Sequence, residues 1–192
     1  MTDHSPVAAL GAVVLAGGTG SRLGGVDKAA LEVDGISLLE RALSAVGAAD
    51  QVVVVGEPVR TTRPVTWTLE EPRSGGPAAG LLAGLDALAG EPELVAVLAV
   101  DAARVTGATY RRLLDAVGTA DAAMLVGAAG QRQTLVAVYR RSSLLAARPA
   151  ERTAEHGLSV RRLVGRMRVV EVPAVGREAH DVDTWEDLRA VR

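Results

Sequence analysis

The stretch Leu15-Ala-Gly-Gly-Thr-Gly-Ser-Arg-Leu-Gly-Gly-Val-Asp-Lys28 directly follows a short apolar run, Ala12-Val-Val-Leu-Ala16. A continuous apolar run that stops at glycines is typical of a strand buried on both faces of a parallel sheet. Glycine lets the backbone approach a bound anion closely, and successive N–H groups can point into such a loop. The stretch therefore predicts a phosphate-binding loop after the first strand of an α/β fold.

Two cations lie in this loop, and one of them is unusual for the chain. Lys28 is the only lysine, whereas every other basic residue of the Lys+Arg total of 21 is an arginine. An ammonium is a compact, mobile charge and a guanidinium is a planar fork, so the two are not interchangeable at a phosphate. We therefore predict that Lys28 contacts phosphate and that Arg22 adds bidentate contacts to phosphate oxygens.

The loop matches neither standard phosphate-binding fingerprint. A dinucleotide-binding GxGxxG would need a glycine in place of Leu23, and a P-loop would need Gly-Lys followed by Ser or Thr. Lys28 instead follows Asp27 and precedes Ala29. The first mismatch argues against a nicotinamide-dependent dehydrogenase.

The composition indicates one domain, residues 1–192, with residues 1–8 as a tail without fixed structure. The chain has no cysteine, so disulfides and thiolate chemistry are excluded. A net charge of -2 gives no basic surface for nucleic acid. No apolar run approaches the roughly 18 residues of a membrane span. We expect a protein of the cytoplasm that binds neither nucleic acid nor membrane.

Further apolar runs alternate with segments of helical period. This alternation predicts βαβ units and an α/β fold, a Rossmann-like three-layer sandwich whose mostly parallel central sheet has helices on both faces. Ser37 and Glu40 form a capping-box pattern, and Pro77 stands at the expected first position of another helix. The predicted strands are 12–16, 51–55, 94–100, 122–126 and 135–139, and the predicted helices are 37–46, 78–89, 109–117 and 184–191.

Asp101 directly follows the most apolar run, 94–100. Ligands of such sheets bind beyond the carboxyl ends of the strands, where Asp101 would face the glycine-rich loop. Mg²⁺ is commonly held by one or two carboxylates together with substrate phosphates. The sequence therefore predicts a metal ligand at Asp101, the alternative being a cap of the following helix.

Asp181 and Asp183 precede the last predicted helix. Side chains at i and i+2 of an extended segment point to the same side. The pair could hold a metal or a substrate hydroxyl, although Asp183 and Thr184 are both candidates for the helix cap.

With Gly76-Pro-Ala-Ala-Gly80 and Asp181-Val-Asp-Thr-Trp-Glu-Asp-Leu188, the loop 15–28 resembles the signatures of nucleotidyltransferases, and specifically of molybdenum cofactor guanylyltransferases. The resemblance spans residues 12–190. It implies a Rossmann-like fold, Mg²⁺ as cofactor, and transfer of GMP from GTP to the phosphate of molybdopterin with release of pyrophosphate. It also implies transient contact with proteins that handle the molybdenum cofactor.

The resemblance assigns roles by position. It implies that Arg22, Lys28 and Asp101 are catalytic, and that Asp101, with Asp183 as a second candidate, binds the metal. The residues that it implies for nucleotide binding are Leu15, Ala16, Gly17, Gly18, Thr19, Gly20, Lys28, Glu71, Gly76 and Asp101.

Two departures from the family pattern leave alternatives open. Ala102-Ala103-Arg104 follows Asp101 where the family has a small residue and proline, and aspartates replace the late asparagines. The alternatives are a related nucleotidyltransferase that uses CTP or a sugar-phosphate acceptor, and a nucleotide-binding homologue without turnover.

Overall fold

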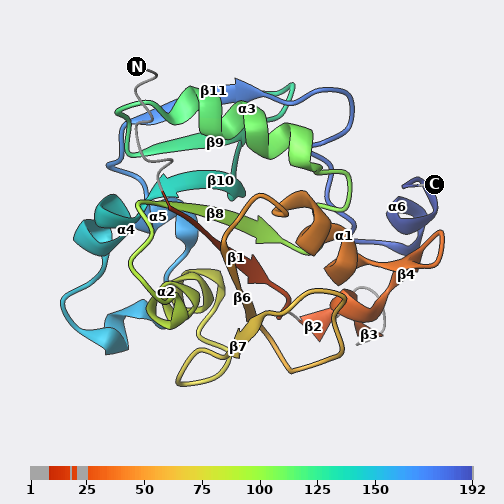
Figure 1. Cartoon of the computed structure of the whole chain (residues 1–192), viewed down its shortest axis with the longest axis horizontal. Coiled ribbons are helices and arrows are strands. Elements are labelled where there is room, and N and C mark those ends of the chain that lie inside the picture. Colours follow the sequence, from red (N-terminus) through yellow and green to blue (C-terminus); the bar gives the residue numbers. More distant parts are fainter. Residues whose placement is uncertain (1–8, 18, 21–25, 192) are drawn as a thin grey trace, which may run out of the picture.

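The computed structural model describes residues 9–17, 19–20 and 26–191. A seven-stranded sheet has the order β11-β9-β10-β8-β1-β6-β7, with β11 and β7 at its two edges (Figure 1). The expected tail, residues 1–8, lies outside the described part of the chain. The strands of this sheet are β1 (Leu10–Leu15), β6 (Gln51–Val55), β7 (Thr66–Thr68), β8 (Leu94–Ala99), β9 (Ala122–Val126), β10 (Arg132–Arg140) and β11 (Val169–Pro173).

Parallel pairing dominates the sheet, as predicted. β1 pairs in parallel with β6 and β8, and the pairs β6–β7 and β9–β11 are also parallel. β10 is the exception, because it runs antiparallel to β8 and β9. Only residues 127–131 separate β9 from β10. This connection is too short for the crossover that a parallel pair needs, so the chain turns back as a hairpin.

Helices cover both faces of the sheet. β1 alternates between the two cores: Val14 packs with helices α1 and α3 on one face, while Val13 packs with α2, α4 and α5 on the other. This period of two is the geometry of a strand buried on both sides. The helices are α1 (Leu38–Ala45), α2 (Pro77–Ala87), α3 (Gly107–Val117), α4 (Arg141–Ala147), α5 (Val160–Leu163) and α6 (Trp185–Arg189).

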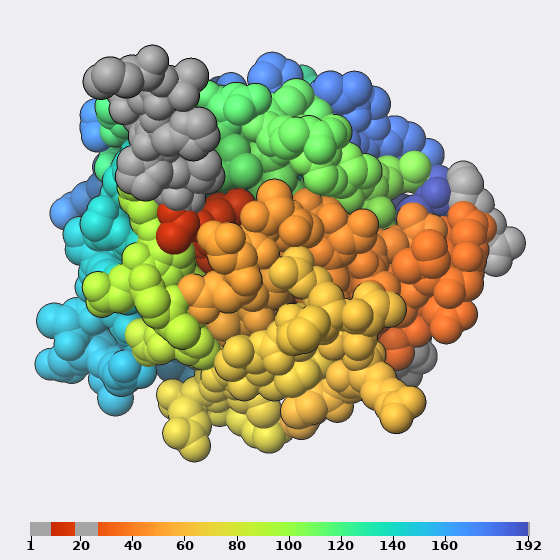
Figure 2. All heavy atoms as spheres, in the orientation of Figure 1, coloured from red at the N-terminus to blue at the C-terminus, as the bar shows by residue number. Residues whose placement is uncertain are grey.

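Two small hairpins lie between β1 and α1. The turn of the second hairpin is Asp34-Gly35, and both residues have positive φ, as a two-residue hairpin turn requires. Figure 2 shows that the chain from α1 to β7 forms the central part of one face of the molecule. The short elements are β2 (Thr19–Gly20) paired with β3 (Val26–Asp27), β4 (Glu32–Val33) paired with β5 (Ile36–Ser37), and the 3₁₀ helices η2 (Lys28–Ala30) and η3 (Arg152–Glu155).

The helix starts agree with the expected caps in part. Ser37 caps α1 by accepting a hydrogen bond from the N–H of Glu40, at 3.2 Å between Oγ and N. The Glu40 carboxylate does not complete the box, because it accepts from the backbone N–H of Thr62 at 2.8 Å. Pro77 is the first residue of α2, as predicted.

In the part of the chain that the model describes, no helix is both long and apolar enough to cross a membrane.

The packing of α2 on the sheet generates a prediction. A Cβ at Gly84 would lie 2.4 Å from Cγ1 of Val13, which is fully buried, so Gly84→Ala should destabilise the fold by about 1–3 kcal/mol. Gly80→Ala, in the same helix, is the matched control, since its Cβ would meet Leu15 at an ordinary 3.4 Å. Because alanine favours helix more than glycine does, Gly80→Ala should be neutral or stabilising. Urea unfolding measures both, and equal stabilities would contradict the packing.

Candidate nucleotide and metal site

A pocket of about 500 Å³ lies at the carboxyl ends of the parallel strands, where the fold predicts a ligand site. The ends of β1, β6 and β8 form its floor. The segment after β7, the first turn of α2 and Lys28 complete the lining. The lining residues that bear on the chemistry are Leu15, Gly17, Lys28, Glu70, Gly76 and Asp101.

The end of β1 is held firmly by its neighbours. The N–H groups of Ala16 and Gly17 both donate to the carbonyl of Val55, at 2.9 and 3.0 Å, and the N–H of Val100 donates to the carbonyl of Leu15 at 3.1 Å. These two N–H groups of the predicted loop are therefore engaged within the protein. Ala16 is buried in the core on the face of α1, while Leu15 and Gly17 line the pocket.

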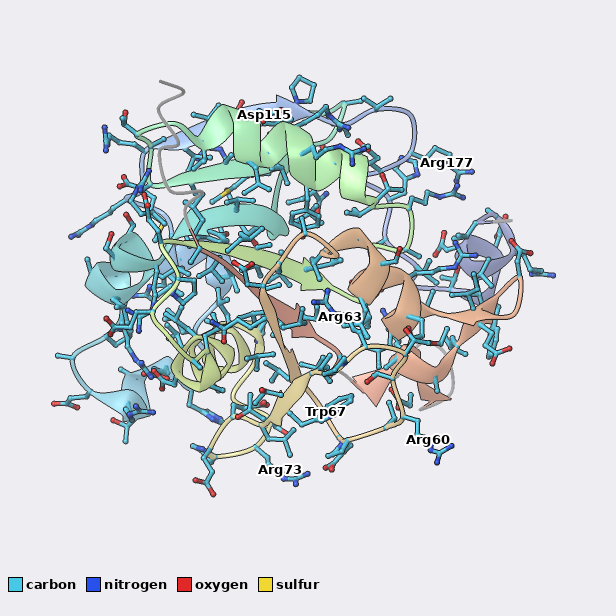
Figure 3. All side chains as sticks on the ribbon, viewed as in Figure 1. Arg60, Arg63, Trp67, Arg73, Asp115 and Arg177 are labelled. Carbon is cyan, nitrogen blue, oxygen red and sulfur yellow. The ribbon has the colours of Figure 1, made fainter. Side chains whose placement is uncertain are left out.

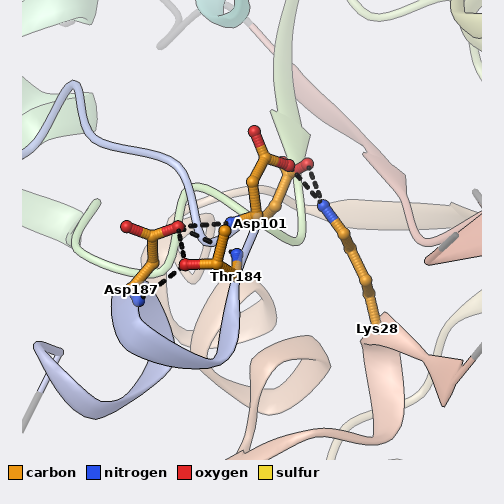
Figure 4. Close-up of polar contacts among 5 residues, drawn as sticks. Lys28, Asp101, Thr184 and Asp187 are labelled. Atoms are coloured by element: carbon orange, nitrogen blue, oxygen red, sulfur yellow. Dashed lines mark hydrogen bonds and ion pairs between the residues drawn. The ribbon is translucent and has the colours of Figure 1, made fainter. Parts of the chain in front are cut away.

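Lys28 turns inward and contacts two carboxylates. Its Nζ lies 2.8 Å from Oδ1 of Asp183 and 3.3 Å from Oδ2 of Asp101, with 16% of the lysine side chain exposed. Figure 4 shows the ammonium directed at this acidic pair. The residue begins the 3₁₀ helix η2, where Asp27 accepts a hydrogen bond from the N–H of Ala29.

The electrostatics of this contact favour the charged lysine. Burial of the ammonium lowers the pKa of Lys28, but its hydrogen bond to Asp183 and the negative charges of Asp101 and Asp183 outweigh that effect. The pKa of Lys28 is therefore raised above its ordinary value. At neutral pH the pocket holds a permanent positive charge beside two carboxylates.

Asp101 is held by a turn at the end of β8. The N–H of Ala103 donates to the carbonyl of Asp101 at 2.8 Å, and Ala102 and Ala103 are both buried in the core. The helix that follows, α3, is capped by Thr106, whose side chain and that of Thr109 form a reciprocal capping box. Asp101 is therefore not the cap of α3, and its carboxylate stays at the rim of the sheet.

The segment Asp181–Asp183 joins the site through a backbone hydrogen bond. The N–H of Val182 donates to the carbonyl of Asp101 at 2.8 Å, and the Val182 side chain is 1% exposed. Because the valine points into the core, the two flanking aspartates are directed to the opposite side, as their i, i+2 spacing predicts. Asp183 thereby reaches Lys28.

Asp181 completes an acidic group around the lysine. Burial of its carboxyl, with the negative charges of Asp101 and Asp183, raises the pKa of Asp181 to about 6, although Lys28 acts in the opposite direction. The residue as a whole is exposed, so water screens part of this repulsion. The Asp181 carboxyl therefore loses its proton near its raised pKa of about 6.

The cap of α6 is Thr184, which resolves the alternative left open by the sequence. Its Oγ1 accepts from the N–H of Asp187 at 3.1 Å, and the Asp187 carboxylate accepts from the N–H of Thr184 at 2.8 Å (Figure 4). Asp187 thus acts in the cap, and Asp183 precedes it with its carboxylate on Lys28.

The first turn of α2 supplies another wall of the pocket. Gly76 has φ of 88°, a conformation that side chains disfavour, and its neighbour Pro77 starts the helix. Amide groups at the beginning of a helix favour a nearby anion. The pocket therefore has a second element suited to phosphate, besides Lys28.

Of the adjacent residues Glu70 and Glu71, only Glu70 lines this pocket. Glu70 lines the pocket and its Oε1 accepts from the N–H of Ser74 at 3.1 Å. Glu71 lies instead along a cavity of about 230 Å³ together with Arg152 and His156. The sequence offered no signal to choose between adjacent glutamates, because the choice depends on where β7 ends.

Two predicted contacts lie outside the described residues, namely Gly18 and Arg22. Thr19 and Gly20 form the two-residue strand β2, which pairs with β3 just before Lys28. Sequence reasoning missed Leu135 of β10, which lines the pocket beside β8. Leu135 reaches the pocket because β10 pairs antiparallel with β8, and no local sequence pattern predicts this position.

Arginines occupy both exposed and largely buried positions, and the Arg148 side chain is 15% exposed. Arg60, Arg73 and Arg177 are exposed and project from the periphery of the molecule (Figure 3). Lys28 is directed into the pocket.

The donor set suits a hard divalent cation that also binds phosphate. Within residues 9–17, 19–20 and 26–191, no three His, Cys, Asp or Glu side chains form a group that could hold a metal. Two carboxylates, those of Asp101 and Asp183, do meet at one point, on Lys28. Such a pair matches Mg²⁺, which keeps water ligands and takes others from substrate phosphates.

Comparison with known proteins gives two partial sequence matches to molybdenum cofactor guanylyltransferases. The one from Acidiphilium cryptum (strain JF-5) is 44% identical over 81 residues, 40% of this chain and 41% of that protein. The one from Rhodopseudomonas palustris (strain BisB5) is 39% identical over 94 residues, 46% of this chain and 43% of that protein. The aligned stretches thus span less than half of these relatives.

Solved structures match nearly the whole chain at low identity. Molybdopterin-guanine dinucleotide biosynthesis protein A from Archaeoglobus fulgidus has a TM-score of 0.70 at 20% identity, covering 94% of this chain and 95% of that one. The Rv0371c protein of Mycobacterium tuberculosis in complex with manganese has a TM-score of 0.68 at 20% identity, covering 96% and 98%. These likenesses confirm the Rossmann-like α/β fold.

The family follows from the sequence model that matches most of the chain. A model described as the MobA-like NTP transferase domain matches residues 12–171, which include Lys28 and Asp101. This chain belongs to the MobA-like NTP transferase domain family.

Proposed function

We propose that this protein transfers GMP from GTP to the phosphate of molybdopterin and releases pyrophosphate, with Mg²⁺ as the metal. The observation that carries the proposal is the contact of Lys28 with Asp101 and Asp183, where Lys28 and Asp101 line a pocket at the end of β1. Family membership and the partial match to molybdenum cofactor guanylyltransferases support the choice of reaction.

The pocket offers places for a nucleoside triphosphate. We assign its base and ribose to the space above Leu15 and Gly17, beside Glu70, and its phosphates to the end that holds Lys28. Arg22 and the glycines of residues 17–20 are further proposed contacts. The start of α2 at Gly76 would favour the phosphates.

Asp101 and Asp183 are the proposed metal ligands. A divalent cation there would neutralise negative charge on the phosphates, and the manganese complex of a protein with the same fold supports a divalent metal in this family. The pairing of two carboxylates at one point provides the oxygen ligands that Mg²⁺ prefers.

The reaction requires no covalent intermediate between the protein and its substrates. An oxygen of the acceptor phosphate attacks the α-phosphorus of GTP, a new P–O bond forms, and the bond to the bridging oxygen of the β-phosphate breaks. Pyrophosphate then leaves with the electron pair. Because the acceptor phosphate is already ionised at neutral pH, no side-chain base is required. Lys28 would position the phosphates and stabilise the charge that grows on the leaving group.

The location and partners of the protein follow from this activity. We propose that it works in the cytoplasm, where both substrates would reach it without crossing a membrane. We also propose transient contacts with proteins that supply or receive the molybdenum cofactor.

Base preference is the first test. At a hundredfold excess over the dissociation constant, a ligand of the native state adds about 2.7 kcal/mol to stability, which raises the melting temperature by about 5–10 °C in a chain of this size. We expect GTP with Mg²⁺ to give the largest shift in a panel with CTP, ATP and UTP, each measured with and without the metal. An equal response to CTP would contradict guanine selection and favour a cytidylyltransferase.

Removing the charge of one proposed metal ligand is the second test. Asp101→Asn should lower Mg²⁺-dependent turnover by at least about a hundredfold, since it removes the negative charge of a metal ligand beside the reacting phosphates. The fold should remain, because this carboxylate lies at the rim of the sheet. Asp115→Asn, at an exposed position of α3, is the matched control for loss of one negative charge (Figure 3). Normal turnover in Asp101→Asn would remove Asp101 from the site.

The single lysine gives the third test. Lys28→Arg keeps the positive charge but replaces a compact ammonium by a larger planar fork. A displacement of about 1 Å at the phosphates can cost on the order of a hundredfold in rate. We therefore expect kcat to fall on that scale, while the free energy of unfolding changes by less than about 1 kcal/mol. Near-normal kcat would show that any cation suffices at this position.

A further inference from the structure

Lys28 and the proposed metal use the same two carboxylates. Its Nζ contacts Oδ1 of Asp183 at 2.8 Å and Oδ2 of Asp101 at 3.3 Å, so the ammonium lies between the atoms assigned to the cation. The side chains of Lys28, Asp101 and Asp183 are 16%, 29% and 48% exposed. The contact is thus partly withdrawn from water, where ion pairs are less screened than on an open surface.

The carboxylates cannot easily leave the lysine to meet a metal elsewhere. Asp101 follows a strand inside the sheet, and its carbonyl is bonded to the N–H of Val182. Asp183 is flanked by buried Val182 and by the cap that Thr184 forms with Asp187. The lysine is the mobile partner, because its charge is carried on a flexible four-carbon stem.

We propose that Lys28 is the resident counter-ion of the Asp101–Asp183 pair, and that a divalent cation must displace it in order to bind. This inference rests on the proposed metal site. The displaced ammonium loses the two carboxylates that stabilise its charge, so it requires a new anionic partner. The phosphates of a nucleoside triphosphate supply that partner.

The exchange couples metal binding to nucleotide binding. A metal that arrives alone must compete with the ammonium of Lys28 for the carboxylates of Asp101 and Asp183. A metal that arrives with a triphosphate gains phosphate oxygens, and the same phosphates receive Lys28. Each ligand therefore favours the other, as reciprocal linkage requires. Lys28 thus has a second role besides contacting phosphate: it weakens metal binding until nucleotide is present.

Titration of Mn²⁺ in the absence of nucleotide tests the displacement directly. Lys28→Met removes the competing charge and retains a flexible apolar stem, so Mn²⁺ should bind at least about tenfold more tightly than to the unmodified protein. Arg73→Met, which removes a positive charge at an exposed position, should leave Mn²⁺ binding unchanged. Electron paramagnetic resonance of free Mn²⁺ gives both dissociation constants. Lys28→Gln is a second variant should Lys28→Met fail to fold.

A measurement on the unmodified protein provides an independent readout. Because the chain has a single lysine, lysine labelled with ¹³C and ¹⁵N gives one set of side-chain NMR signals. Addition of Mg²⁺ alone should shift the ε-CH₂ signal as the ammonium leaves the carboxylates, and the shift should follow the metal titration. Lys28→Met with unchanged or weaker Mn²⁺ binding, metal binding that leaves the lysine signal unmoved, or no metal binding at all would each overturn the inference.

These outcomes are separate from those of the proposed function. A protein that fails to respond to GTP, yet binds Mn²⁺ more tightly once Lys28 is replaced, would lose the guanylyltransferase assignment and keep the displacement. A protein that responds to GTP with Mg²⁺, yet shows no gain of Mn²⁺ affinity in Lys28→Met, would keep the assignment and lose the displacement.

Discussion

The parallel pairing of β1 with both β6 and β8 is the constraint from which the site follows. Residues in register, such as Leu15 with Val55 and with Ala99, end their strands at one edge of the sheet. Every parallel pair directs its next residues beyond that edge, so three chain segments far apart in sequence open into the same space. The direction of the parallel strands therefore determines where the pocket lies, and the side chains at their ends determine its chemistry.

Much of this arrangement could be predicted from local pattern. Strands that are buried on both faces are recognisable in a sequence as apolar runs. Two of them, 51–55 and 122–126, were predicted with their observed bounds. The mostly parallel sheet and the helix starts at Ser37 and Pro77 were also confirmed. These features depend on neighbours within a few residues, which is why a single sequence reveals them. The role assigned to Arg22 stays a prediction, because this residue lies outside the described part of the chain.

What the sequence could not reveal depends on distant contacts. β11 has a weaker apolar pattern because it lies at the edge of the sheet, with Glu171 exposed, and it was not predicted. The choice of Glu70 over Glu71 and the entry of Leu135 into the pocket both depend on tertiary placement. The contact of Lys28 with Asp183 spans 155 residues and requires the hydrogen bond from Val182 to Asp101. Both aspartates were singled out from the sequence, but their shared partner was not.

A chain with one lysine, held in an ion pair, carries a natural reporter. Its ε-amine is the single side-chain amine of the protein, and acylating reagents attack amines only in their neutral form. Burial limits access to the nitrogen, and the two carboxylates keep it protonated. Its modification rate is therefore controlled by how often the pair opens, a quantity that mass spectrometry of one peptide can follow. Arginine side chains do not react with the same reagents, so acylation of Lys28 follows the site without an engineered label.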